Sequence, residues 1–440
     1  MSTTSIIILA AGKSSRMHST TSKVMHLISG KPALSYILDT VTSIKADQVL
    51  LVTSPFMEDI REYVSNSYAN IKHIIQEKSL GTGDAVKTAL KELNKKGKTI
   101  ILYGDTPFIS ESTINELKES SQDILLVGFH TNHPKSYGRL ITYDDDLLEI
   151  VEFTEANDEQ KLLTHCNSGI VAIKNEYLHK LIPLIKNKNA KGEFYLTDII
   201  KLANYHDIPC QVYNVEREEV IGINTREDLS LAEEIMQNKI KTRLMNQGVT
   251  IINPFTSYIA YDFKAGNDVT IFPNIFIGNN VSVGNNVEIH SFSHLDGVTV
   301  EDNVKIGPFA RIRPQTYLSK DVKIGNFVEV KNSKIGAESK INHLSYIGDS
   351  EIGWETNIGA GSITCNYDGI KKKSKTSIGN QVAIGSNVCL VAPVSIADRA
   401  YIAAGSVITK DVDEDDLAFG RAKQVTLKEK AISLRNKHGQ

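Results

Sequence analysis

The sequence of 440 residues predicts an α/β domain with a doubly wound sheet, followed by a parallel β-helix. In the first half short apolar runs alternate with amphipathic stretches, and in the second half an aliphatic residue returns every six positions. A helix-forming segment lies between these two patterns. We therefore expect domains at residues 1–226 and 248–440, joined by a linker helix at residues 227–247.

The first apolar run, Ser5–Ala11, has the composition of a strand that is buried on both faces of a parallel sheet. The turn after it, residues 12–16, begins with Gly12 and contains Lys13 and Arg16, and Lys23 follows a few residues later. In open α/β sheets such a turn presents backbone N–H groups to a phosphate. It matches neither a Walker A loop nor a GxGxxG fingerprint. On spacing alone, an ordinary strand-to-helix turn explains it equally well.

The alternation of strands and helices continues after this turn, as expected of a Rossmann-like doubly wound parallel sheet. A helical stretch starts near Pro32. Further strands are expected at Gln48–Thr53, Ile71–Gln76, Thr99–Tyr103 and Ile124–Phe129, and helices near Asp59–Asn66, Asp84–Asn94 and Thr113–Ser120.

Two short motifs fall at carboxyl ends of these strands, where such sheets bind their ligands. One is Gln76 followed by Leu80–Gly83, and the other is Tyr103–Asp105. Asp105 is well placed to hold Mg²⁺, which prefers carboxylate and phosphate oxygens. A lone Asp after a strand is otherwise a turn or helix-cap residue.

Polar groups also end several apolar runs in the second part of this domain. They occur at Tyr137–Arg139, Ile150–Glu152, Asn167–Gly169 and Ile221–Asn224. Each alone is explained as a turn, but together they are typical of the walls of a sugar pocket. Residues 192–198 predict a loop that leads into a helix, and we assign no catalytic role to Asp198.

The linker predicts one helix from Thr225 to Asn246. Thr225 and Asp228 have the spacing of a capping box, and Gly248 ends the helix. We expect its apolar stripe to pack between the domains; the stripe consists of Leu229, Ala232, Ile235, Met236, Ile240 and Leu244.

The six-residue period is the strongest pattern in the chain. A fixed hexapeptide period is typical of a parallel β-helix, in which each repeat is a short strand and a tight corner. A sandwich of short strands would not predict so regular a spacing, and a helix needs apolar spacings of three and four. The aliphatic positions are Ile271, Ile277, Val283, Ile289, Ile306, Ile312, Leu318, Ile324, Val330, Ile378, Ile384, Leu390, Ile396, Ile402 and Ile408.

Composition and charge are ordinary for a globular protein, with 41% hydrophobic residues, 23% charged residues and a net charge of −3. This balance predicts neither a nucleic-acid footprint nor a membrane patch. The four cysteines lack metal-ligand spacing, which suits free thiols in a reducing compartment. Ser5–Ala11 is too short to span a membrane and has no basic residue before it. We expect a cytoplasmic location.

The motifs in the first half resemble those of the sugar-phosphate nucleotidyltransferases. They are Leu9–Gly12 with Arg16, Met17 and Lys23, then Leu80–Gly83 and Tyr103–Asp105. Joined to a left-handed hexapeptide β-helix, the chain resembles the bacterial bifunctional family of N-acetylglucosamine-1-phosphate uridylyltransferases and glucosamine-1-phosphate N-acetyltransferases. The resemblance covers nearly the full length, and its most specific stretches are residues 306–314, 325–331, 343–349 and 357–369.

For the first domain, the resemblance implies transfer of a uridylyl group from UTP to N-acetylglucosamine 1-phosphate, with Mg²⁺ as cofactor. Arg16 and Lys23 would hold the triphosphate, and Asp105 and Asn224 would ligate the metal. Ser14-Ser15 stand where the family has Gly-Thr, and because serine still donates to phosphate we expect function to be kept. The nucleotide and sugar contacts would be Leu9, Ala10, Ala11, Gly12, Lys23, Gln76, Gly81, Thr82, Tyr103, Gly104, Asp105, Gly138, Glu152, Asn167 and Asn224.

For the β-helix, the resemblance implies acetyl transfer from acetyl-CoA to glucosamine 1-phosphate, which needs a base and oxyanion donors. His343 would be the base and Glu329 would orient its imidazole, although a histidine on such a face is by itself more often an ordinary surface residue. The implied sugar-phosphate contacts are Arg313, Lys331, Tyr346 and Asn357. The implied acetyl-CoA contacts are Ala360, Asn366, Tyr367, Ser386, Ala404 and Arg421.

Several alternatives stay open at this point. One lysine of Lys371–Lys373 or Lys375 reaches a ligand phosphate in this reading, but the loop is a residue longer than usual, so its identity stays open. The family forms trimers with acetyltransferase sites between subunits, which composition does not show. A single-activity nucleotidyltransferase with a structural β-helix would not need His343 or Asn366-Tyr367, and a non-catalytic scaffold would not need Arg16, Lys23 and Asp105 together.

Overall fold

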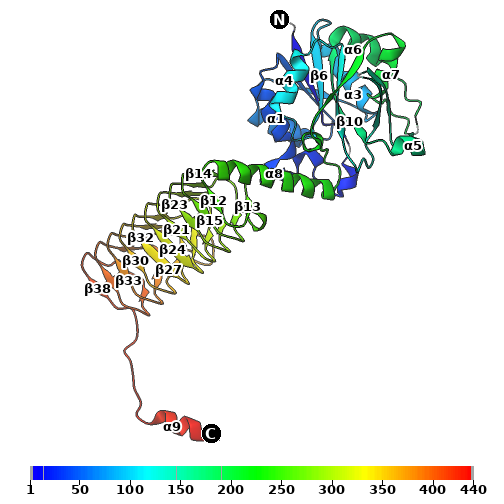
Figure 1. Cartoon of the computed structure of the whole chain (residues 1–440). Coiled ribbons are helices and arrows are strands. Elements are labelled where there is room, and N and C mark those ends of the chain that lie inside the picture. The colour runs from blue at the N-terminus through cyan, green and yellow to red at the C-terminus, as the bar shows by residue number, and fades with distance from the viewer. Residues whose placement is uncertain (1–2, 13, 145, 190, 438–440) are drawn as a thin grey trace. The chain divides into compact units, whose positions relative to one another are not determined.

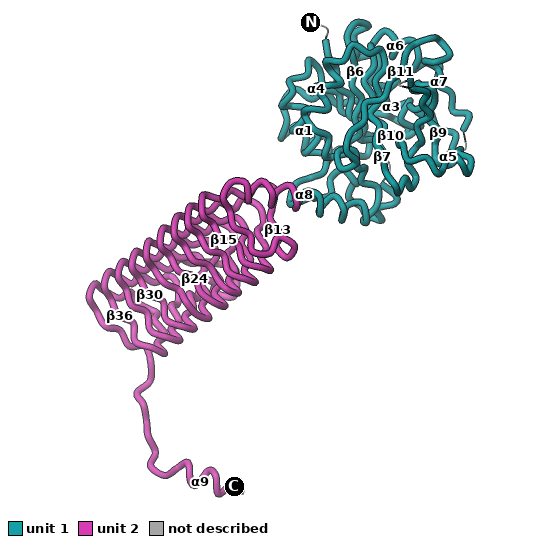
Figure 2. The backbone as a smooth tube through the Cα atoms, viewed as in Figure 1, with its two compact units in different colours: residues 1–236 teal, residues 237–440 magenta. Residues whose placement is uncertain are grey.

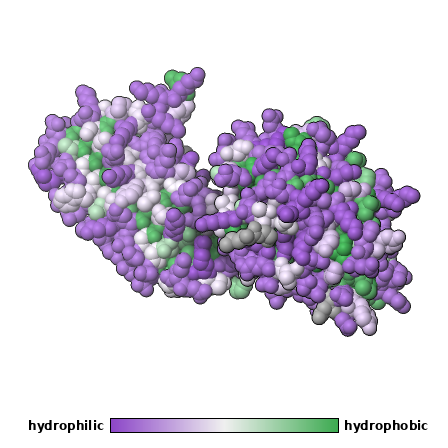
Figure 3. All heavy atoms as spheres, turned by 90° about the horizontal axis from the view of Figure 1, so that it is seen from above, coloured by the Kyte–Doolittle hydropathy of each residue, from purple (hydrophilic) through white to green (hydrophobic). Residues whose placement is uncertain are grey.

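The computed structural model describes residues 3–12, 14–144, 146–189 and 191–437. The chain forms two compact units, residues 1–236 and residues 237–440 (Figure 2). The division falls within helix α8 (Arg226–Asn246). In the view of Figure 3 the surface is mainly hydrophilic, with small hydrophobic patches. Among the described residues, no helix is long and apolar enough to cross a membrane.

Unit 1 is built around a nine-stranded sheet of order β5-β4-β1-β6-β10-β7-β11-β9-β8 (Figure 1). Strands β5, β4, β1 and β6 run parallel, so their carboxyl ends meet at one edge. Strand β10 runs antiparallel to β6 and β7, which makes the sheet mixed. The strands are β1 (Thr4–Leu9), β4 (Gln48–Thr53), β5 (Ile71–Ile75), β6 (Lys98–Tyr103), β7 (Ile124–His130), β8 (Arg139–Tyr143), β9 (Asp146–Val151), β10 (His165–Lys174) and β11 (Cys210–Asn214), with a separate pair β2 (Leu27–Ile28) and β3 (Lys31–Pro32).

Helices cover both faces of this sheet because alternate strand residues point to opposite faces. In β1, Ile7 joins a core with helices α3, α6 and α7, whereas Ile6 and Ile8 join a second core with α1, α2 and α4. The α-helices are α1 (Ala33–Ser43), α2 (Glu58–Ser67), α3 (Thr82–Ala89), α4 (Glu111–Glu119), α5 (Asp158–Lys161), α6 (Asn175–Leu181) and α7 (Asp198–Tyr205). The 3-10 helices are η1 (Ser15–Met17), η2 (Lys23–Met25), η3 (Leu90–Glu92), η4 (Ile182–Leu184) and η5 (Arg217–Val220).

The elements expected from the sequence are present with small shifts at their ends. Strands β4 to β7 agree with the expected ranges within one residue at each end. Helix α3 ends at Ala89 and continues as η3, so the expected helix near Asp84–Asn94 is two elements. The capping box of α8 is confirmed, because Thr225 Oγ1 accepts from the Asp228 N–H at 3.1 Å and Asp228 Oδ2 accepts from the Thr225 N–H at 2.9 Å.

The apolar stripe of α8 contributes to a different core in each unit. Ala232 belongs to a cluster with Met17, Ile28 and Phe108 in unit 1. Ile240 and Leu244 are buried in unit 2. In unit 2 the Gln237 amide also bonds to both backbone groups of Ile259, at 2.8 and 3.1 Å.

Unit 2 is a left-handed parallel β-helix with three sheets (Figure 1). We name each sheet by its first strand. The β12 sheet contains β12 (Thr250–Ile251), β15 (Thr270–Ile271), β18 (Glu288–Ile289), β21 (Lys305–Ile306), β24 (Lys323–Asn326), β27 (Lys340–His343), β30 (Asn357–Ile358), β33 (Ala383–Ile384), β36 (Tyr401–Ile402) and β38 (Leu417–Ala418). The β13 sheet contains β13 (Tyr258–Ile259), β16 (Phe276–Ile277), β19 (His294–Leu295), β22 (Arg311–Ile312), β25 (Glu329–Lys331), β28 (Tyr346–Gly348), β31 (Ile363–Cys365), β34 (Cys389–Val391) and β37 (Val407–Ile408). The β14 sheet contains β14 (Lys264–Ala265), β17 (Ser282–Val283), β20 (Val298–Val300), β23 (Thr316–Leu318), β26 (Lys334–Ile335), β29 (Ser350–Ile352), β32 (Thr376–Ile378) and β35 (Val394–Ile396).

The hexapeptide period corresponds to inward ladders of stacked aliphatic side chains. Ile271 pairs with Ile289, which pairs with Ile306, and all three side chains are buried. The corners between sheets require a positive φ, which Asn274 supplies at +60°. A 3-10 helix, η6 (Pro254–Thr256), lies in the first coil, and helix α9 (Lys430–Lys437) follows the last strand in an exposed segment.

Candidate active sites

A cavity of about 650 Å³ lies at the carboxyl edge of the sheet in unit 1, where β1 and β6 end. This volume is within the range of small-molecule pockets. It is lined by Leu9, Ala10, Ala11, Gly12, Ser15, Arg16, Lys23, Val24, Gln76, Ser79, Gly81, Thr82, Ala85, Tyr103, Asp105, Thr106, Tyr137, Ser168, Lys191, Glu193, Val220, Gly222 and Asn224.

Two cations, one carboxylate and one amide oxygen meet at one end of this cavity. The Lys23 ammonium forms an ion pair with the Asp105 carboxylate and donates to Asn224 Oδ1 at 2.9 Å. The Arg16 guanidinium donates to the same Asn224 oxygen at 2.9 Å. Both side chains of the ion pair are largely shielded from solvent, which strengthens their attraction. The four residues expected to handle phosphate and metal therefore lie together.

The local backbone explains how Lys23 and Asn224 reach Asp105. Ser14 Oγ accepts from the Lys23 N–H at 2.8 Å, so Ser14 orders the start of η2. The Ile223 N–H donates to the Asp105 carbonyl at 2.9 Å, which places Asn224 beside the end of β6. Lys13, the other cation expected near this turn, lies outside the described residues.

The Gln76 end of the cavity is closed by a tight loop. Gln76 is buried and its amide donates to the Gly81 carbonyl at 3.1 Å and to Asp84 Oδ2 at 2.8 Å. Gly81 has a φ of +113°, and a Cβ there would lie 2.5 Å from the Phe194 carbonyl oxygen. Only glycine fits this position. Thr82 Oγ1 accepts from the Leu196 N–H at 3.0 Å, which fixes the same loop against residues 194–196.

Some of the expected nucleotide and sugar contacts are not among the residues that line the cavity. Gly104, Gly138, Glu152 and Asn167 do not line the cavity. Asn167 Oδ1 accepts from the Gly169 N–H at 2.8 Å, and Glu152 Oε1 accepts from the Thr197 hydroxyl at 3.0 Å.

Burial raises the pKa of both Glu152 and Tyr103. The wall also contains Ser168, which belongs to the expected Asn167–Gly169 motif, and Lys191 and Glu193, which the sequence patterns did not identify as contacts. Lys191 and Glu193 come from the loop before α7, and only its proximity in the fold identifies them.

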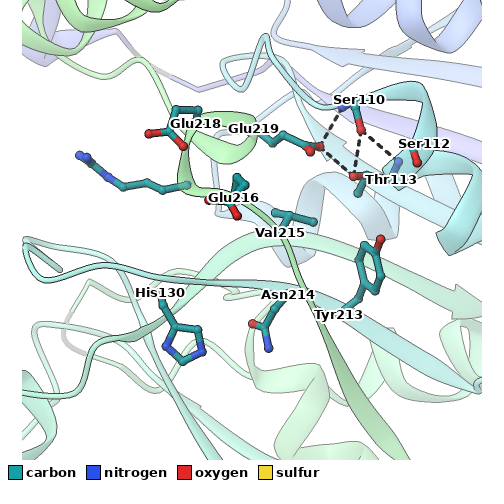
Figure 4. A pocket seen from close by; sticks show the side chains of 11 residues that line it. Ser110, Ser112, Thr113, His130, Tyr213, Asn214, Val215, Glu216, Glu218 and Glu219 are labelled. Atoms are coloured by element: carbon teal, nitrogen blue, oxygen red, sulfur yellow. Dashed lines mark hydrogen bonds between the residues drawn. The ribbon is translucent and has the colours of Figure 1, made fainter.

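A second hollow of about 640 Å³ in unit 1 contains none of the expected residues. Figure 4 shows Ser110 and Thr113 at the start of α4 directed at Glu219 of η5. Glu219 Oε2 accepts from the Ser110 N–H at 3.1 Å and from the Thr113 hydroxyl at 2.7 Å (Figure 4). Ser110 Oγ caps α4 by accepting from the Thr113 N–H at 3.1 Å, and the Glu219 carboxylate joins η5 to the same helix start.

In unit 2, His343 lies at the corner between the β12 and β13 sheets. The exposed imidazole Nδ1 is 2.9 Å from Asn326 Oδ1 in the preceding coil, and these two residues are register partners. Residues of the following coils stack on the same edge. The Gly361 N–H donates to the His343 carbonyl, and the Asn387 N–H donates to the Ala360 carbonyl. We call this edge the His343 corner; its column is Asn326, His343, Ala360, Ser386 and Ala404.

Cationic and amide groups gather at the next corner, between the β13 and β14 sheets. Lys331 and Lys373 line a hollow of about 660 Å³ there. Lys373 interacts directly with Lys331 and is the main cause of a lowered Lys331 pKa. Burial alone would raise the pKa of Asp349, but hydrogen bonds from Asn332 and Asn366, with both lysines, lower it. We call this edge the Lys331 corner.

Two lysines of the 371–375 loop, Lys373 and Lys375, line the hollow at the Lys331 corner. Lys373 faces Lys331, whereas Lys375 forms an ion pair with Glu351 at 2.5 Å. The lysine that belongs to the cationic cluster is therefore Lys373.

The face of the β13 sheet between the two corners carries Tyr346. Gly348 lies beneath it, since a Cβ there would be 2.5 Å from Tyr346 Oη and 2.8 Å from Asn366 Nδ2. Asn357 is exposed on the β12 sheet, one coil after Lys340. Tyr346 and Asn366, expected to touch different substrates, are thus brought together.

Glu329 does not have the position expected of a partner of His343. Its Oε1 accepts from the Arg313 guanidinium at 2.8 Å, and its register partner is Tyr346. Because β-strand residues pair strictly by register, the residue opposite His343 is Asn326. In this structure Asn326 replaces Glu329 as the partner of the imidazole.

The expected acetyl-CoA contacts divide between the corners. Ala360, Ser386 and Ala404 lie at the His343 corner. Arg421 reaches it as well, because a Cβ on Gly405 would be 3.9 Å from Arg421 Cδ. Asn366 and the exposed Tyr367 lie at the Lys331 corner instead.

Comparison with known proteins matches both halves of the chain. Residues 6–167 match the MobA-like NTP transferase domain, and residues 375–410 match the bacterial transferase hexapeptide (six repeats). Residues 274–307 match the hexapeptide repeat of succinyl-transferase, and residues 294–367 match the GMPPB C-terminal domain.

Curated relatives match over nearly the whole length. The bifunctional protein GlmU of Zymomonas mobilis is 42% identical over 429 residues, which cover 96% of this chain and 95% of the relative. The bifunctional protein GlmU of Bartonella quintana is 42% identical over 433 residues, covering 98% and 96%. The chain belongs to the GlmU family.

This GlmU-family chain is therefore a bifunctional transferase with one candidate site in each unit. The NTP transferase match contains the β1 turn, the Gln76 loop and Asp105, and the GMPPB C-terminal match contains Lys331 and His343. Among solved structures, the inositol-1-phosphate CTP transferase from T. maritima is 17% identical with a TM-score of 0.44, covering 52% of this chain and 94% of that one.

Proposed function

We propose that this chain catalyses two steps of UDP-N-acetylglucosamine synthesis, which supplies precursor for peptidoglycan and lipopolysaccharide. Unit 2 transfers the acetyl group of acetyl-CoA to the amine of glucosamine 1-phosphate. Unit 1 transfers the uridylyl group of UTP to N-acetylglucosamine 1-phosphate and releases pyrophosphate. The observation that carries this proposal is that one chain of the GlmU family contains both the Lys23–Asp105–Asn224 cavity and the exposed His343 beside the Lys331 corner.

In unit 1, a phosphate oxygen of the sugar phosphate attacks the α-phosphorus of UTP, and pyrophosphate leaves. No protein nucleophile is required, so the cavity acts by positioning and by neutralising charge. Arg16 and Lys23 give up their contacts with Asn224 and Asp105, and these two cations then bind the triphosphate. Gln76, Gly81 and Thr82, which line the cavity at its other end, bind the uracil.

The residues at the end of the cavity fit a magnesium ion. The Lys23 ammonium already lies between a carboxylate oxygen of Asp105 and the amide oxygen of Asn224, so these oxygens converge on a point that favours positive charge. Among the described residues there is no cluster of three or more His, Cys, Asp or Glu side chains suited to a metal. Two protein oxygens, completed by phosphates and water, are typical of Mg²⁺ sites. When bound, the ion would neutralise charge on the pyrophosphate.

In unit 2, the amine of glucosamine 1-phosphate attacks the acetyl thioester, the C–S bond breaks and CoA leaves as the thiol. The His343 imidazole takes the proton of the amine. Lys331, Lys373 and Arg313 hold the sugar phosphate at the neighbouring corner, where their charges are concentrated. Tyr346 lies between the base and this anion site.

We also propose that the active form is a homotrimer with acetyltransferase sites between copies. An apolar ridge, made of Phe292, Phe309, Phe327 and Leu344, stacks in the open beside the His343 corner. All four residues have a positive φ, which bulky side chains rarely adopt. Burial against a second copy would offset that strain. The division of the acetyl-CoA contacts between two corners also favours a site completed by another copy.

A cytoplasmic location fits the cysteines. Cys166, Cys210, Cys365 and Cys389 are all free, and burial raises the pKa of Cys210 to about 12. Unpaired thiols are typical of reducing compartments.

The test is a coupled assay with glucosamine 1-phosphate, acetyl-CoA, UTP and Mg²⁺, in which CoA thiol and pyrophosphate are followed separately. We expect both products, with pyrophosphate delayed until acetylated sugar has formed. Pyrophosphate that appears only when N-acetylglucosamine 1-phosphate is added, with no CoA released, would instead show a single-activity nucleotidyltransferase.

A further inference from the structure

The imidazole of His343 has a specific partner that the proposed mechanism does not use. Its Nδ1 lies 2.9 Å from Oδ1 of Asn326, which precedes it by one coil. Asn326 ends β24 and His343 ends β27, so the pair is fixed by backbone register as well as by the side chains. The Leu344 N–H donates to the Asn326 carbonyl at 3.1 Å, which holds the two residues on the same edge.

We infer that Asn326 is a positioning residue that sets the tautomer and ring orientation of His343, leaving Nε2 as the atom that takes the proton. An amide oxygen only accepts hydrogen bonds, so the Nδ1 atom that faces it must carry the hydrogen. In a neutral imidazole the lone pair then belongs to Nε2. This inference rests on the proposed role of His343 as the base.

The residues after His343 in the same column keep the other side of the ring accessible. Ala360, Ser386 and Ala404 continue the edge beyond His343, and each has a small side chain. Asn326 therefore contacts the imidazole from the preceding coil. The other side of the imidazole lies toward the following coils, which contain expected acetyl-CoA contacts. A base placed this way takes a proton on the side where the thioester would bind.

The Glu329 carboxylate lies on the neighbouring β13 sheet, but the partner of the His343 imidazole is the Asn326 amide. Glu329 is bonded to Arg313 at 2.8 Å, so its charge is directed to the Lys331 corner side of the β13 sheet. A carboxylate on Nδ1 would raise the pKa of the imidazole and keep it protonated to higher pH. A neutral amide fixes the tautomer without that effect.

The experiment compares Asn326→Ala and Asn326→Asp in the full-length protein across pH 6 to 9. For Asn326→Ala we expect kcat of acetyl transfer to fall by roughly 10- to 100-fold, part of the roughly 10²–10⁴-fold contributed by general-base catalysis. KM for both substrates should stay within about twofold, because a positioning residue acts on the imidazole and not on a substrate. Asn326→Asp should restore most of kcat and move the acidic limb of the pH profile to higher pH, since the new carboxylate favours the protonated imidazole.

Two controls separate this effect from misfolding. Uridylyl transfer by the same variants should be unchanged. Asn285→Ala removes a similar bond between coils, Asn285 Nδ2 to Asp302 Oδ1 at 3.1 Å, far from His343, and it should leave acetyl transfer unchanged.

The inference is overturned if Asn326→Ala keeps kcat within twofold, or if Asn326→Asp neither rescues activity nor moves the acidic limb. His343→Gln distinguishes this from failure of the proposed function. If His343→Gln retains acetyl transfer, the base assignment itself is wrong. If His343→Gln is inactive while Asn326→Ala is fully active, only the positioning role is wrong.

Discussion

Lys23 shows how single side chains set up the nucleotide site. Its ammonium is shared by Asp105 and Asn224, and Arg16 donates to the same Asn224 oxygen. The Asp105 carboxylate and the Asn224 amide oxygen are therefore both held by cations of the chain itself. In the proposed function, a triphosphate with its metal would exchange these partners, so we expect the local charge to stay balanced in both states.

Replacing Asp105 by Asn should reduce uridylyl transfer by on the order of 100-fold or more, because the site loses the charge that favours a cation. Acetyl transfer should be unchanged, since His343 belongs to the other unit. Pyrophosphate and CoA release measure the two activities separately. Asp123→Asn, which breaks an ion pair with Lys174 at 2.5 Å outside the cavity, is the matched control. Loss of both activities in a folded Asp105→Asn variant would contradict the two-site arrangement.

The Lys331–Lys373 pair predicts an unusual pH dependence of sugar-phosphate binding. Lys373 lowers the pKa of Lys331, so Lys331 loses its proton at lower pH than an ordinary lysine. KM for glucosamine 1-phosphate should therefore begin to rise at a less alkaline pH than for a site with an isolated lysine. A dianionic phosphate restores the proton, so binding should be accompanied by proton uptake.

This dependence is tested by measuring KM between pH 7.5 and 10 in the wild type and in Lys373→Ala. The variant should bind more weakly overall, because it has lost a cation, but its rise in KM should move to higher pH. Lys371→Ala is the control from the same loop. An unmoved alkaline limb in Lys373→Ala would show that the two lysines are not coupled in the binding site.

At the scale of elements, the segment from η5 to α8 is held at each end by the hydrogen bonds of one carboxylate, which we call an anchor. Glu219 accepts hydrogen bonds from Ser110 and Thr113 at the start of α4, and Asp228 accepts from the backbone of Asn224 and Thr225. Between these anchors lies the stretch that supplies Gly222 and Asn224 to the cavity. The position of Asn224, the proposed metal ligand, thus depends on a helix start that lies outside the cavity.

Removing one anchor should loosen this stretch. Glu219→Ala leaves the Ser110 N–H and the Thr113 hydroxyl without their carboxylate, at a cost of about 1–3 kcal/mol in unfolding free energy. We also expect a weaker response of uridylyl transfer to Mg²⁺. Urea unfolding and a Mg²⁺ titration of activity measure the two effects. Glu218→Ala, an exposed neighbour on the same 3-10 helix, should change neither; equal behaviour of the two variants would refute the anchor.

At the scale of the whole molecule, each unit has its own core and its own candidate site. The sheet cores on both faces of unit 1 do not involve residues of the β-helix. Unit 2 has its interior filled by aliphatic ladders, and its reactive groups lie on outer corners. A β-helix with a filled interior can bind substrates only on its outside, where another copy can complete the site.

The apolar ridge allows a clean test of assembly. In the double variant Phe309→Asn and Phe327→Asn, the ridge is lost, but asparagine tolerates the positive φ at both positions better than phenylalanine does. The fold should therefore be kept while the trimer dissociates, with loss of acetyl transfer and retention of uridylyl transfer. Sedimentation velocity and the two assays measure these outcomes. Glu338→Asn, at an exposed corner with φ +61°, is the control, and an intact trimer in the double variant would exclude the ridge as the interface.

The sequence by itself determined the periodic parts of this protein. The hexapeptide period predicted the β-helix, because a repeat that stacks on itself needs only local spacing to define its core. The apolar runs and capping residues predicted β4 to β7 and helix α8 within one residue at each end, since burial and capping depend on neighbours in the chain. The strand-end motif placed Asp105 at the ligand-binding edge of the sheet, because parallel strands end at a common edge, whereas only the family resemblance implied that Arg16, Lys23 and Asn224 join it.

Only the tertiary structure decided which distant groups are partners. Lys23 and Asn224 are 201 positions apart, and their contact depends on a strand order that local patterns do not encode. The sequence did not predict that β10 runs antiparallel, nor that Glu152 and Asn167 do not line the cavity. Similarly, the register between coils makes Asn326 the partner of His343. Glu329 instead accepts a hydrogen bond from Arg313. The spacing of apolar residues along the chain specifies which side chains are buried. The packing of strands specifies which distant side chains become neighbours.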